Sequence, residues 1–265
     1  TNGNHSLTNW DYNSKSNLHI FGINTIENPG DLYLRGKTQK KITSHYDYIK
    51  MEFNLPTQKV VSWNGEDGVR VEGILYLPHN FQESKKYPLV VQTHGGPRSS
   101  DKFGFSRSAT RYNAVLTGKG YVVLQPNYRG STGYGDAFLR DMVGGYFNQS
   151  HLDVMTGVDY LIDEGIADSD KLIKMGWSAG GHMTNKIITH TDRFKAASSG
   201  AGAVNWIGMY AQSDVRLNRT AWFGGTPWEK GAPIDVFWNN SPLKNIHKVK
   251  TPTLVLVGGN DKRVP

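Results

Sequence analysis

A serine lies between glycines in the run GWSAGG at residues 176–181, which fits the pattern G-x-S-x-G. The apolar stretch LIKM precedes this run, and the helix-compatible stretch HMTNKIITH follows it. A strand that turns sharply into a helix strains the backbone of the serine, and glycines two residues to either side avoid clashes. The turn raises the hydroxyl above the sheet, where the helix dipole favours negative charge. We therefore predict that Ser178 is a nucleophile; the alternative is a glycine-rich turn with an inert serine.

A second glycine-rich run, His94-Gly95-Gly96-Pro97, follows another short apolar stretch. Acyl transfer needs two N–H donors directed at the developing oxyanion. One donor is expected from Ala179, the residue after the nucleophile, and the other from a loop of this type. Gly96 is the candidate for the second donor, because the loop must approach the substrate without a side chain in the way. The alternative is an ordinary Gly-Pro turn.

An acidic residue, Asp261, follows the apolar stretch TPTLVLV at residues 251–257. In a catalytic triad, an acid after a late strand accepts a hydrogen bond from the histidine and fixes its tautomer. We predict that Asp261 is this acid. The alternative is a turn aspartate, since Asn-Asp is common turn chemistry.

The general base is not evident, because every histidine precedes Asp261, whereas the order Ser, Asp, His places the base after the acid. His94 is expected to brace the glycine-rich loop, His182 to lie one helical turn below the nucleophile, and His247 to precede the last strand. Structural roles are therefore predicted for these three. We expect the catalytic histidine to lie beyond Pro265, and residues 1–265 alone to have negligible catalytic turnover. The nine histidines are His5, His19, His45, His79, His94, His151, His182, His190 and His247.

Buried strands and amphipathic helices alternate in the part of the chain that holds these residues. Continuous apolar runs of this length are typical of strands buried on both faces of a parallel sheet. Between them, four apolar residues recur at helical spacing on one face: Val154, Val158, Leu161 and Ile162. Asp153 is a plausible first-turn acid or N-cap, and Gly165 a plausible helix stop. The pattern predicts an α/β fold with a mostly parallel sheet, whose chemistry collects at the carboxyl ends of the strands. The expected strands are Val69–Leu77, Pro88–Thr93, Tyr121–Gln125, Leu172–Gly176 and Thr251–Val257.

The first sixty residues differ from the rest in composition and in hydrophobic pattern. They are polar and contain three strand-like pieces, Leu18–Ile23, Asp31–Arg35 and Lys40–Thr43, separated by turn formers. This pattern predicts antiparallel hairpins.

Composition excludes several classes of function. The 265 residues contain no cysteine, which excludes disulfides, thiolate metal sites and a cysteine nucleophile. No run of eighteen apolar residues occurs, so no transmembrane helix and no membrane partner are expected. The net charge of +7 is dispersed, which argues against a nucleic-acid groove. The compartment, cytoplasmic or secreted/periplasmic, stays open.

Several colinear motifs, from about residue 31 to residue 265, resemble the prolyl oligopeptidase family of serine peptidases, and its acylaminoacyl-peptidase and dipeptidyl-peptidase-like members above all. The resemblance implies a β-propeller followed by an α/β-hydrolase domain. Residues 1–60 would then be the end of the propeller and a linker, and residues 61–265 a catalytic domain that is incomplete at its C-terminus. The motifs are DLYLRGKTQKKIT, VVSWNGEDGVRVEGILYLP, THGGP, QPNYRGSTGYG, DVMTGVDYLIDEG, GWSAGGHM, FGGTPWE, NNSPL and TPTLVLVGGNDKRVP.

The resemblance also implies a function and site roles. It implies hydrolysis of short peptides or release of N-terminal residues, with Ser178 as nucleophile and Asp261 as triad acid. Ala179 and the His94–Pro97 loop, which includes Gly95 and Gly96, match the oxyanion hole. Tyr128 and Arg129 match a loop that flanks the site; the alternative is a scaffold role, with Arg129 paired to a buried acid. No metal or organic cofactor is implied, and the expected partner is a peptide substrate.

Two other functions stay open, a carboxylesterase with the same serine turn and a catalytically dead hydrolase fold used for binding. A missing last strand and helix would leave an apolar sheet edge exposed. We therefore expect further polypeptide against that edge, from the same chain or from a partner chain. Side-chain preference, exo- or endopeptidase mode and a possible homo-oligomer are not decided by the sequence.

Overall fold

The structure is a computed structural model that describes residues 5–106, 108 and 110–265. The chain divides into two compact units. The first unit comprises Thr1–Lys59, Ile74–Phe81 and Lys102–Val122, and the second comprises Val60–Gly73, Gln82–Asp101 and Val123–Pro265. All of the predicted site residues belong to the second unit, which therefore positions the candidate site. The expected end of a propeller within residues 1–60 stays a prediction.

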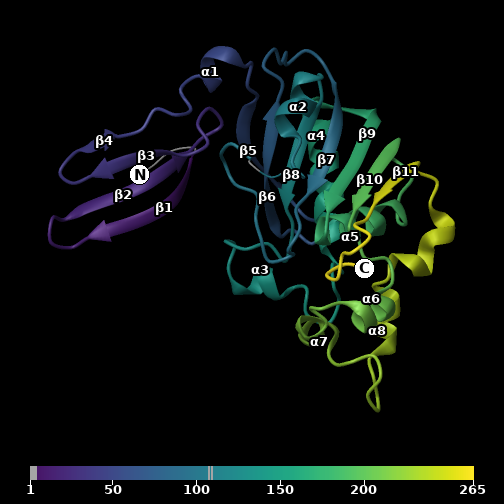
Figure 1. Cartoon of the computed structure of the whole chain (residues 1–265). Helices are drawn as coiled ribbons and strands as arrows, with labels where there is room; N and C mark the ends of the chain where they lie inside the picture. The colour runs from purple at the N-terminus through teal and green to yellow at the C-terminus, as the bar shows by residue number, and fades with distance from the viewer. Residues whose placement is uncertain (1–4, 107, 109) are drawn as a thin grey trace. The chain divides into compact units, whose positions relative to one another are not determined.

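The first unit contains an antiparallel sheet in the order β1-β2-β3-β4 (Figure 1). The strands predicted near residues 18–23 and 31–35 are confirmed, and the third predicted piece forms only over Gln39–Lys41. Asn28 explains the turn between β2 and β3, because its side-chain oxygen accepts hydrogen bonds from the main-chain N–H groups of Gly30 and Asp31. The elements are β1 (Ser6–Asn13), β2 (Leu18–Asn24), β3 (Asp31–Arg35), β4 (Gln39–Lys41), α1 (Ile49–Glu52) and α2 (Asn113–Gly118).

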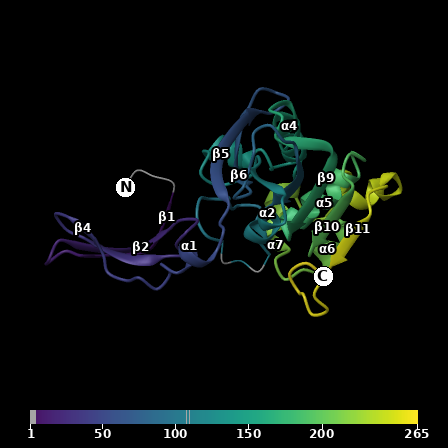
Figure 2. The ribbon, with the colours of Figure 1, turned by 90° about the horizontal axis from the view of Figure 1, so that it is seen from above.

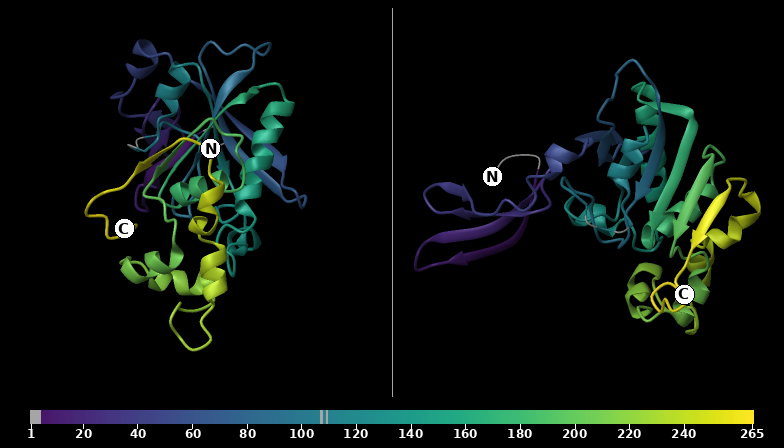
Figure 3. Two further views of the ribbon diagram at one scale, coloured as in Figure 1. Left: turned by 90° about the vertical axis from the view of Figure 1, so that its right-hand side faces the viewer. Right: turned by 45° about the horizontal axis from the view of Figure 1, so that its top comes forward.

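A seven-stranded sheet in the order β11-β10-β9-β7-β8-β6-β5 organises the candidate site. The pairs β7–β9, β9–β10 and β10–β11 are parallel, so their carboxyl ends lie at one edge (Figures 1 and 3). Helices α6, α7 and α8 lie beyond this edge (Figure 1). The strands are β5 (Thr57–Asn64), β6 (Arg70–Leu77), β7 (Tyr87–Thr93), β8 (Val122–Asn127), β9 (Ala167–Trp177), β10 (Ala196–Gly200) and β11 (Thr253–Leu256). The helices are α3 (Asp136–Arg140), α4 (Ser150–Asp163), α5 (Ala179–Ile188), α6 (Trp206–Gln212), α7 (Leu217–Phe223), α8 (Ile234–Asn239) and the 3-10 helix η1 (Pro242–Lys248).

The core of the second unit follows from the predicted apolar runs. Leu89, Val91 and Leu172 in the central strands are fully buried, as expected for strands covered on both faces. The predicted apolar face of α4 is confirmed at Val154, Val158 and Leu161, which are fully buried, whereas Ile162 at the end of that face is only partly buried. Helix α4 ends as predicted, with Gly165 two residues past its last residue at a φ of 71°.

Strand β11 departs from the prediction of a strand buried on both faces. It lies at the edge of the sheet, as Figure 2 shows, and it pairs only with β10. Leu254, Val255 and Val257 are 58%, 69% and 64% exposed. The apolar pattern at residues 251–257 was interpreted correctly as a strand. Burial of that strand would need other elements packed against it, and the described residues provide none at this edge of the sheet.

No helix in the described part of the chain combines the length and the apolar character that crossing a membrane requires.

Candidate active site

Ser178 occupies the predicted turn between β9 and α5. Its backbone adopts φ 59° and ψ −122°, a left-handed region that non-glycine residues rarely occupy. The N–H of Ser178 donates to the carbonyl of Gly200 on β10 at 2.8 Å, and its own carbonyl accepts from the N–H of His182 at 3.0 Å. The strand–turn–helix predicted for GWSAGG is therefore confirmed, and the serine is held between two elements.

The glycines of this turn are required by backbone contacts. A Cβ on Gly176 would lie 2.2 Å from the carbonyl oxygen of Gly180, and a Cβ on Gly180 would lie 2.1 Å from that of Thr93. Thr93 ends β7, so the first turn of α5 packs directly on the end of the neighbouring strand. This packing explains why only glycine fits at the two flanking positions.

The glycine-rich loop that follows β7 lies beside the nucleophile. A Cβ on Gly95 would be 3.2 Å from the Cβ and 3.7 Å from the Oγ of Ser178. Gly96 has a φ of 121°, which few other residues adopt. The structure therefore brings the predicted loop and Ser178 together, while Ala179 begins α5 with its N–H unused by the helix.

His94 and Tyr128 brace this loop. The two rings stack with centroids 4.5 Å apart, and the Tyr128 hydroxyl donates to the carbonyl of His94 at 2.7 Å. The ring nitrogens of His94 lie 2.8 Å from the carbonyl of Gly95 and 2.9 Å from Oγ of Ser131. All of these groups except Gly95 are buried. His94 thus occupies the bracing position expected from the sequence, and Tyr128 is its support.

Arg129 is held in an ion-pair network. Its guanidinium contacts the buried Asp153 on α4 at 2.6 Å and Asp67 at 2.5 Å. Hydrogen bonds with Asp153 raise the pKa of Arg129, although burial opposes this, and the hydrogen bond from Arg129 lowers the pKa of Asp67. The N–H of Arg129 also donates to Asp153 at 2.9 Å. These contacts match the scaffold alternative, in which Arg129 pairs with a buried acid and fixes the segment that carries Tyr128.

Asp261 follows the edge strand two positions away from the nucleophile strand. In the sheet, Gly200 of β10 is paired with Trp177 on one side and with Leu256 on the other. The axes of β9 and β11 are therefore about 10 Å apart, twice the usual strand spacing. Oδ1 of Asp261 accepts hydrogen bonds from the N–H groups of Arg263 and Val264 at 2.8 and 3.0 Å. Ser178 and Asp261 thus follow two parallel strands of one sheet that are separated by β10.

The other histidines of the second unit have contacts or positions of their own. His182 is fully buried, Nδ1 lies 2.8 Å from the carbonyl of Ala203, and burial lowers its pKa to about 3. Nδ1 of His151 lies 3.2 Å from the carbonyl of Phe147 and Nδ1 of His190 lies 2.7 Å from that of Lys186, with the two ring centroids 4.7 Å apart. His247 lies in η1, before β11, as expected. These positions support structural roles.

Sequence reasoning missed Lys174, which lies inside the LIKM stretch that was interpreted only as a strand. Its side chain is fully buried beneath the serine turn and forms three hydrogen bonds there. The signal was available, because a lysine is rare at a buried strand position unless its amine has partners.

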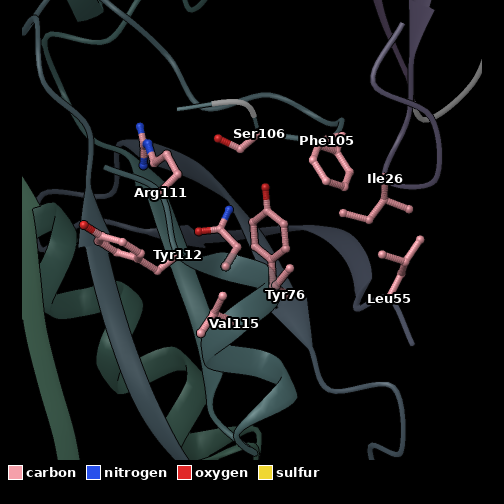
Figure 4. Close-up of a pocket in the computed structure, with 10 residues that line it drawn as sticks. Ile26, Leu55, Tyr76, Phe105, Ser106, Arg111, Tyr112 and Val115 are labelled. Atoms are coloured by element: carbon pink, nitrogen blue, oxygen red, sulfur yellow. The ribbon is translucent and has the colours of Figure 1, made fainter. Parts of the chain in front are cut away.

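A small cavity of about 70 Å³ lies in the first unit (Figure 4). Ile26, Leu55 and Phe105 lie on one side of Tyr76, and Arg111 is among the residues on the other side. None of the predicted site residues lines this cavity.

The parallel sheet and the serine turn after β9 define an α/β-hydrolase, and comparisons with known proteins agree. The profile of the prolyl oligopeptidase family matches residues 108–265, more than half of the chain. An uncharacterized peptidase of Bacillus subtilis, YuxL, is 33% identical over 249 residues. An acylamino-acid-releasing enzyme of Arabidopsis thaliana is 36% identical over 206 residues. The solved acylaminoacyl peptidase of Pyrococcus horikoshii is 26% identical, with a TM-score of 0.88.

The chain belongs to the prolyl oligopeptidase family, which confirms the resemblance seen in the motifs. It spans only part of each of these relatives. The matches cover 93%, 74% and 100% of this chain, but 37%, 26% and 42% of the Bacillus, Arabidopsis and Pyrococcus proteins respectively.

Proposed function

We propose that this chain carries the nucleophile and the oxyanion-binding loop of a serine peptidase that hydrolyses short peptides or releases N-terminal residues. The observation that carries the proposal is the left-handed backbone of Ser178 between β9 and α5, with the His94–Pro97 loop at its side. Similarity to acylaminoacyl peptidases favours substrates with an acylated N-terminal residue.

In the proposed mechanism, Oγ of Ser178 attacks the scissile carbonyl while a histidine base takes the hydroxyl proton. The N–H groups of Ala179 and Gly96 donate hydrogen bonds to the resulting oxyanion. Collapse of the tetrahedral intermediate breaks the C–N bond, and the histidine gives its proton to the leaving amine. Water then hydrolyses the acyl-enzyme and restores the serine. Asp261 accepts the N–H of the histidine and holds its orientation. Neither a metal nor an organic cofactor takes part.

The base in this mechanism is a histidine outside residues 1–265. Support comes from the contacts of the histidines in the second unit, each of which is engaged elsewhere or precedes β11. The exposed apolar side chains of β11 offer a surface on which the polypeptide that brings this histidine would pack.

The protein expressed from its complete gene tests this function on acylaminoacyl anilides, aminoacyl anilides and nitrophenyl esters. Ser178→Ala is expected to lower kcat/KM for the anilides by at least about 1000-fold, because the nucleophile is lost. Ser44→Ala, an exposed serine of the first unit, serves as the control and is expected to leave kcat/KM unchanged. Anilide hydrolysis that survives in Ser178→Ala would contradict the proposal, and hydrolysis of esters alone would favour a carboxylesterase.

A further inference from the structure

Lys174 is a fully buried amine directly beneath the candidate nucleophile. It lies on β9, four residues before Ser178, and its side chain has no solvent exposure. Nζ donates hydrogen bonds to Oγ1 of Thr93 at 2.7 Å, to the carbonyl of Met175 at 2.9 Å and to Oγ1 of Thr184 at 3.0 Å. No ion pair with a carboxylate is found for it among the described residues, so these three oxygens are its partners.

The directions of the neighbouring hydrogen bonds fix the role of this amine as a triple donor. The hydroxyls of Thr93 and Thr184 both donate to the carbonyl of Gly180, at 3.0 and 2.9 Å. Both threonine oxygens therefore accept from Lys174, and the carbonyl of Met175 can only accept. Three acceptors suit the three N–H bonds of an ammonium group. Burial lowers the pKa of Lys174 well below its usual value.

The network joins the elements that would form the two halves of the oxyanion hole. Thr93 ends β7 and is followed directly by the His94–Pro97 loop, whereas Gly180 and Thr184 lie on α5, which begins at Ala179. Lys174 reaches both from β9. The first turn of α5 and the end of β7 are already in close backbone contact at Gly180. A shift of either β7 or α5 would thus move the N–H group of Gly96 away from the N–H group of Ala179.

We propose that Lys174 is a positioning residue that fixes the serine turn against the root of the glycine-rich loop, so that the N–H groups of Ala179 and Gly96 converge on one oxygen. This inference rests on the proposed function. Displacements of about 1 Å in such donors cost on the order of 100-fold in rate. Contacts with the substrate away from the reacting carbonyl do not involve this network. Loss of the Lys174 hydrogen bonds is therefore expected to lower kcat and to leave KM unchanged.

The test compares Lys174→Met with Lys186→Met in the protein expressed from its complete gene. Methionine keeps the length of the side chain, removes a buried charge that has no carboxylate partner, and leaves no hydrogen-bond donor unsatisfied. Lys174→Met is therefore expected to keep or raise the Tm while kcat falls at least about 10-fold and KM stays within about twofold.

Lys186 is the matched control. It is a buried lysine on α5, eight residues after Ser178, and it contacts the carbonyl of Tyr146 and Oδ1 of Asn240 at 3.5 and 3.4 Å. Lys186→Met is expected to leave kcat unchanged. Unchanged kcat in Lys174→Met, or an equal loss of kcat in both variants, would overturn the positioning role.

Thr184→Val decides the question if Lys174→Met does not fold. It removes one hydroxyl of the network and leaves the amine in place, so a smaller fall in kcat is expected, again with KM unchanged. A Thr184→Val enzyme with the kcat of the wild type would overturn the inference. Failure of the proposed function is recognised separately, because Ser178→Ala would then be as active as the wild type, and both proposals would fall together.

Discussion

Hydrogen bonds and ring stacking hold the individual residues of the candidate site in place. Ser178 adopts a backbone conformation that costs about 1–3 kcal/mol for a non-glycine residue. Hydrogen bonds from Ser178 to Gly200 and from His182 to Ser178 hold the serine in this conformation. Beside it, the stacked rings of His94 and Tyr128 support the loop that carries Gly96. Strain that is maintained in this way is typical of a preorganised nucleophile.

The role of Asp261 is tested by Asp261→Asn in the protein expressed from its complete gene. An amide in place of the carboxylate favours the wrong tautomer of the histidine, so kcat is expected to fall by about 10,000-fold. The control is Asp214→Asn, which removes an exposed carboxylate paired with Arg263 near the same segment. Steady-state kinetics on an acylaminoacyl anilide measure both variants. Equal activity of Asp261→Asn and Asp214→Asn would exclude Asp261 from the triad.

His182 predicts an acid-sensitive stability. Burial lowers its pKa in the folded protein to about 3, below the usual value near 6.5. Between these values the unfolded chain binds a proton that the folded chain does not. The stabilisation is therefore complete above pH 6.5 and is lost as the pH falls towards 3, at about 1.4 kcal/mol per pH unit.

Urea unfolding between pH 6 and pH 4 measures this dependence as a slope of unfolding free energy against pH. His182→Gln is expected to reduce the slope by about 1.4 kcal/mol per pH unit. His151, whose pKa burial also lowers to about 3, is expected to contribute a similar amount, and the double variant should lose both. A slope that is unchanged in His182→Gln would contradict the burial of a neutral imidazole.

At the scale of elements, the sequence predicted what depends on local pattern. The apolar runs gave the central strands, and the spacing of Val154, Val158 and Leu161 gave the buried face of α4. Glycines two residues to either side of Ser178 gave the serine turn. Contacts between elements distant in the chain were less accessible: the pairing of Arg129 with Asp153 was foreseen only as an alternative, and the bonds of Lys174 were missed. Periodicity alone indicates a strand buried on both faces at residues 251–257, and only the resemblance, with its missing last strand and helix, indicated an exposed apolar sheet edge.

The contact between α5 and β7 predicts the effect of Gly180→Ala. A Cβ there would lie 2.1 Å from the carbonyl oxygen of Thr93, and backbone cannot yield as a side chain can. We expect a fall in Tm of more than about 5 °C, corresponding to a loss of several kcal/mol, and loss of hydrolysis. Gly118→Ala, at the end of α2 with open space around its Cβ, is the control and should leave the Tm nearly unchanged. Thermal unfolding followed by circular dichroism compares them, and equal Tm values would contradict the close packing described for the serine turn.

At the scale of the whole molecule, the chain has the elements that place Ser178, the His94–Pro97 loop and Asp261, but it spans less than half the length of the relatives reported above. The chain carries a four-stranded antiparallel sheet and the seven-stranded hydrolase sheet, whose edge strand β11 is exposed. The activity of the whole protein therefore depends, in the proposed account, on polypeptide that supplies the histidine and covers β11. Residues 1–265 alone are expected to lack peptidase turnover.

Labelling with a fluorophosphonate probe tests the nucleophile most directly, because the probe reacts with an activated serine and marks it covalently. The account predicts one adduct per molecule in the protein expressed from its complete gene, located by peptide mass spectrometry at Ser178 and absent from Ser178→Ala. It also predicts negligible labelling of residues 1–265 expressed alone. An adduct on another residue, or an enzyme that hydrolyses acylaminoacyl anilides while Ser178 stays unlabelled, would contradict the central claim.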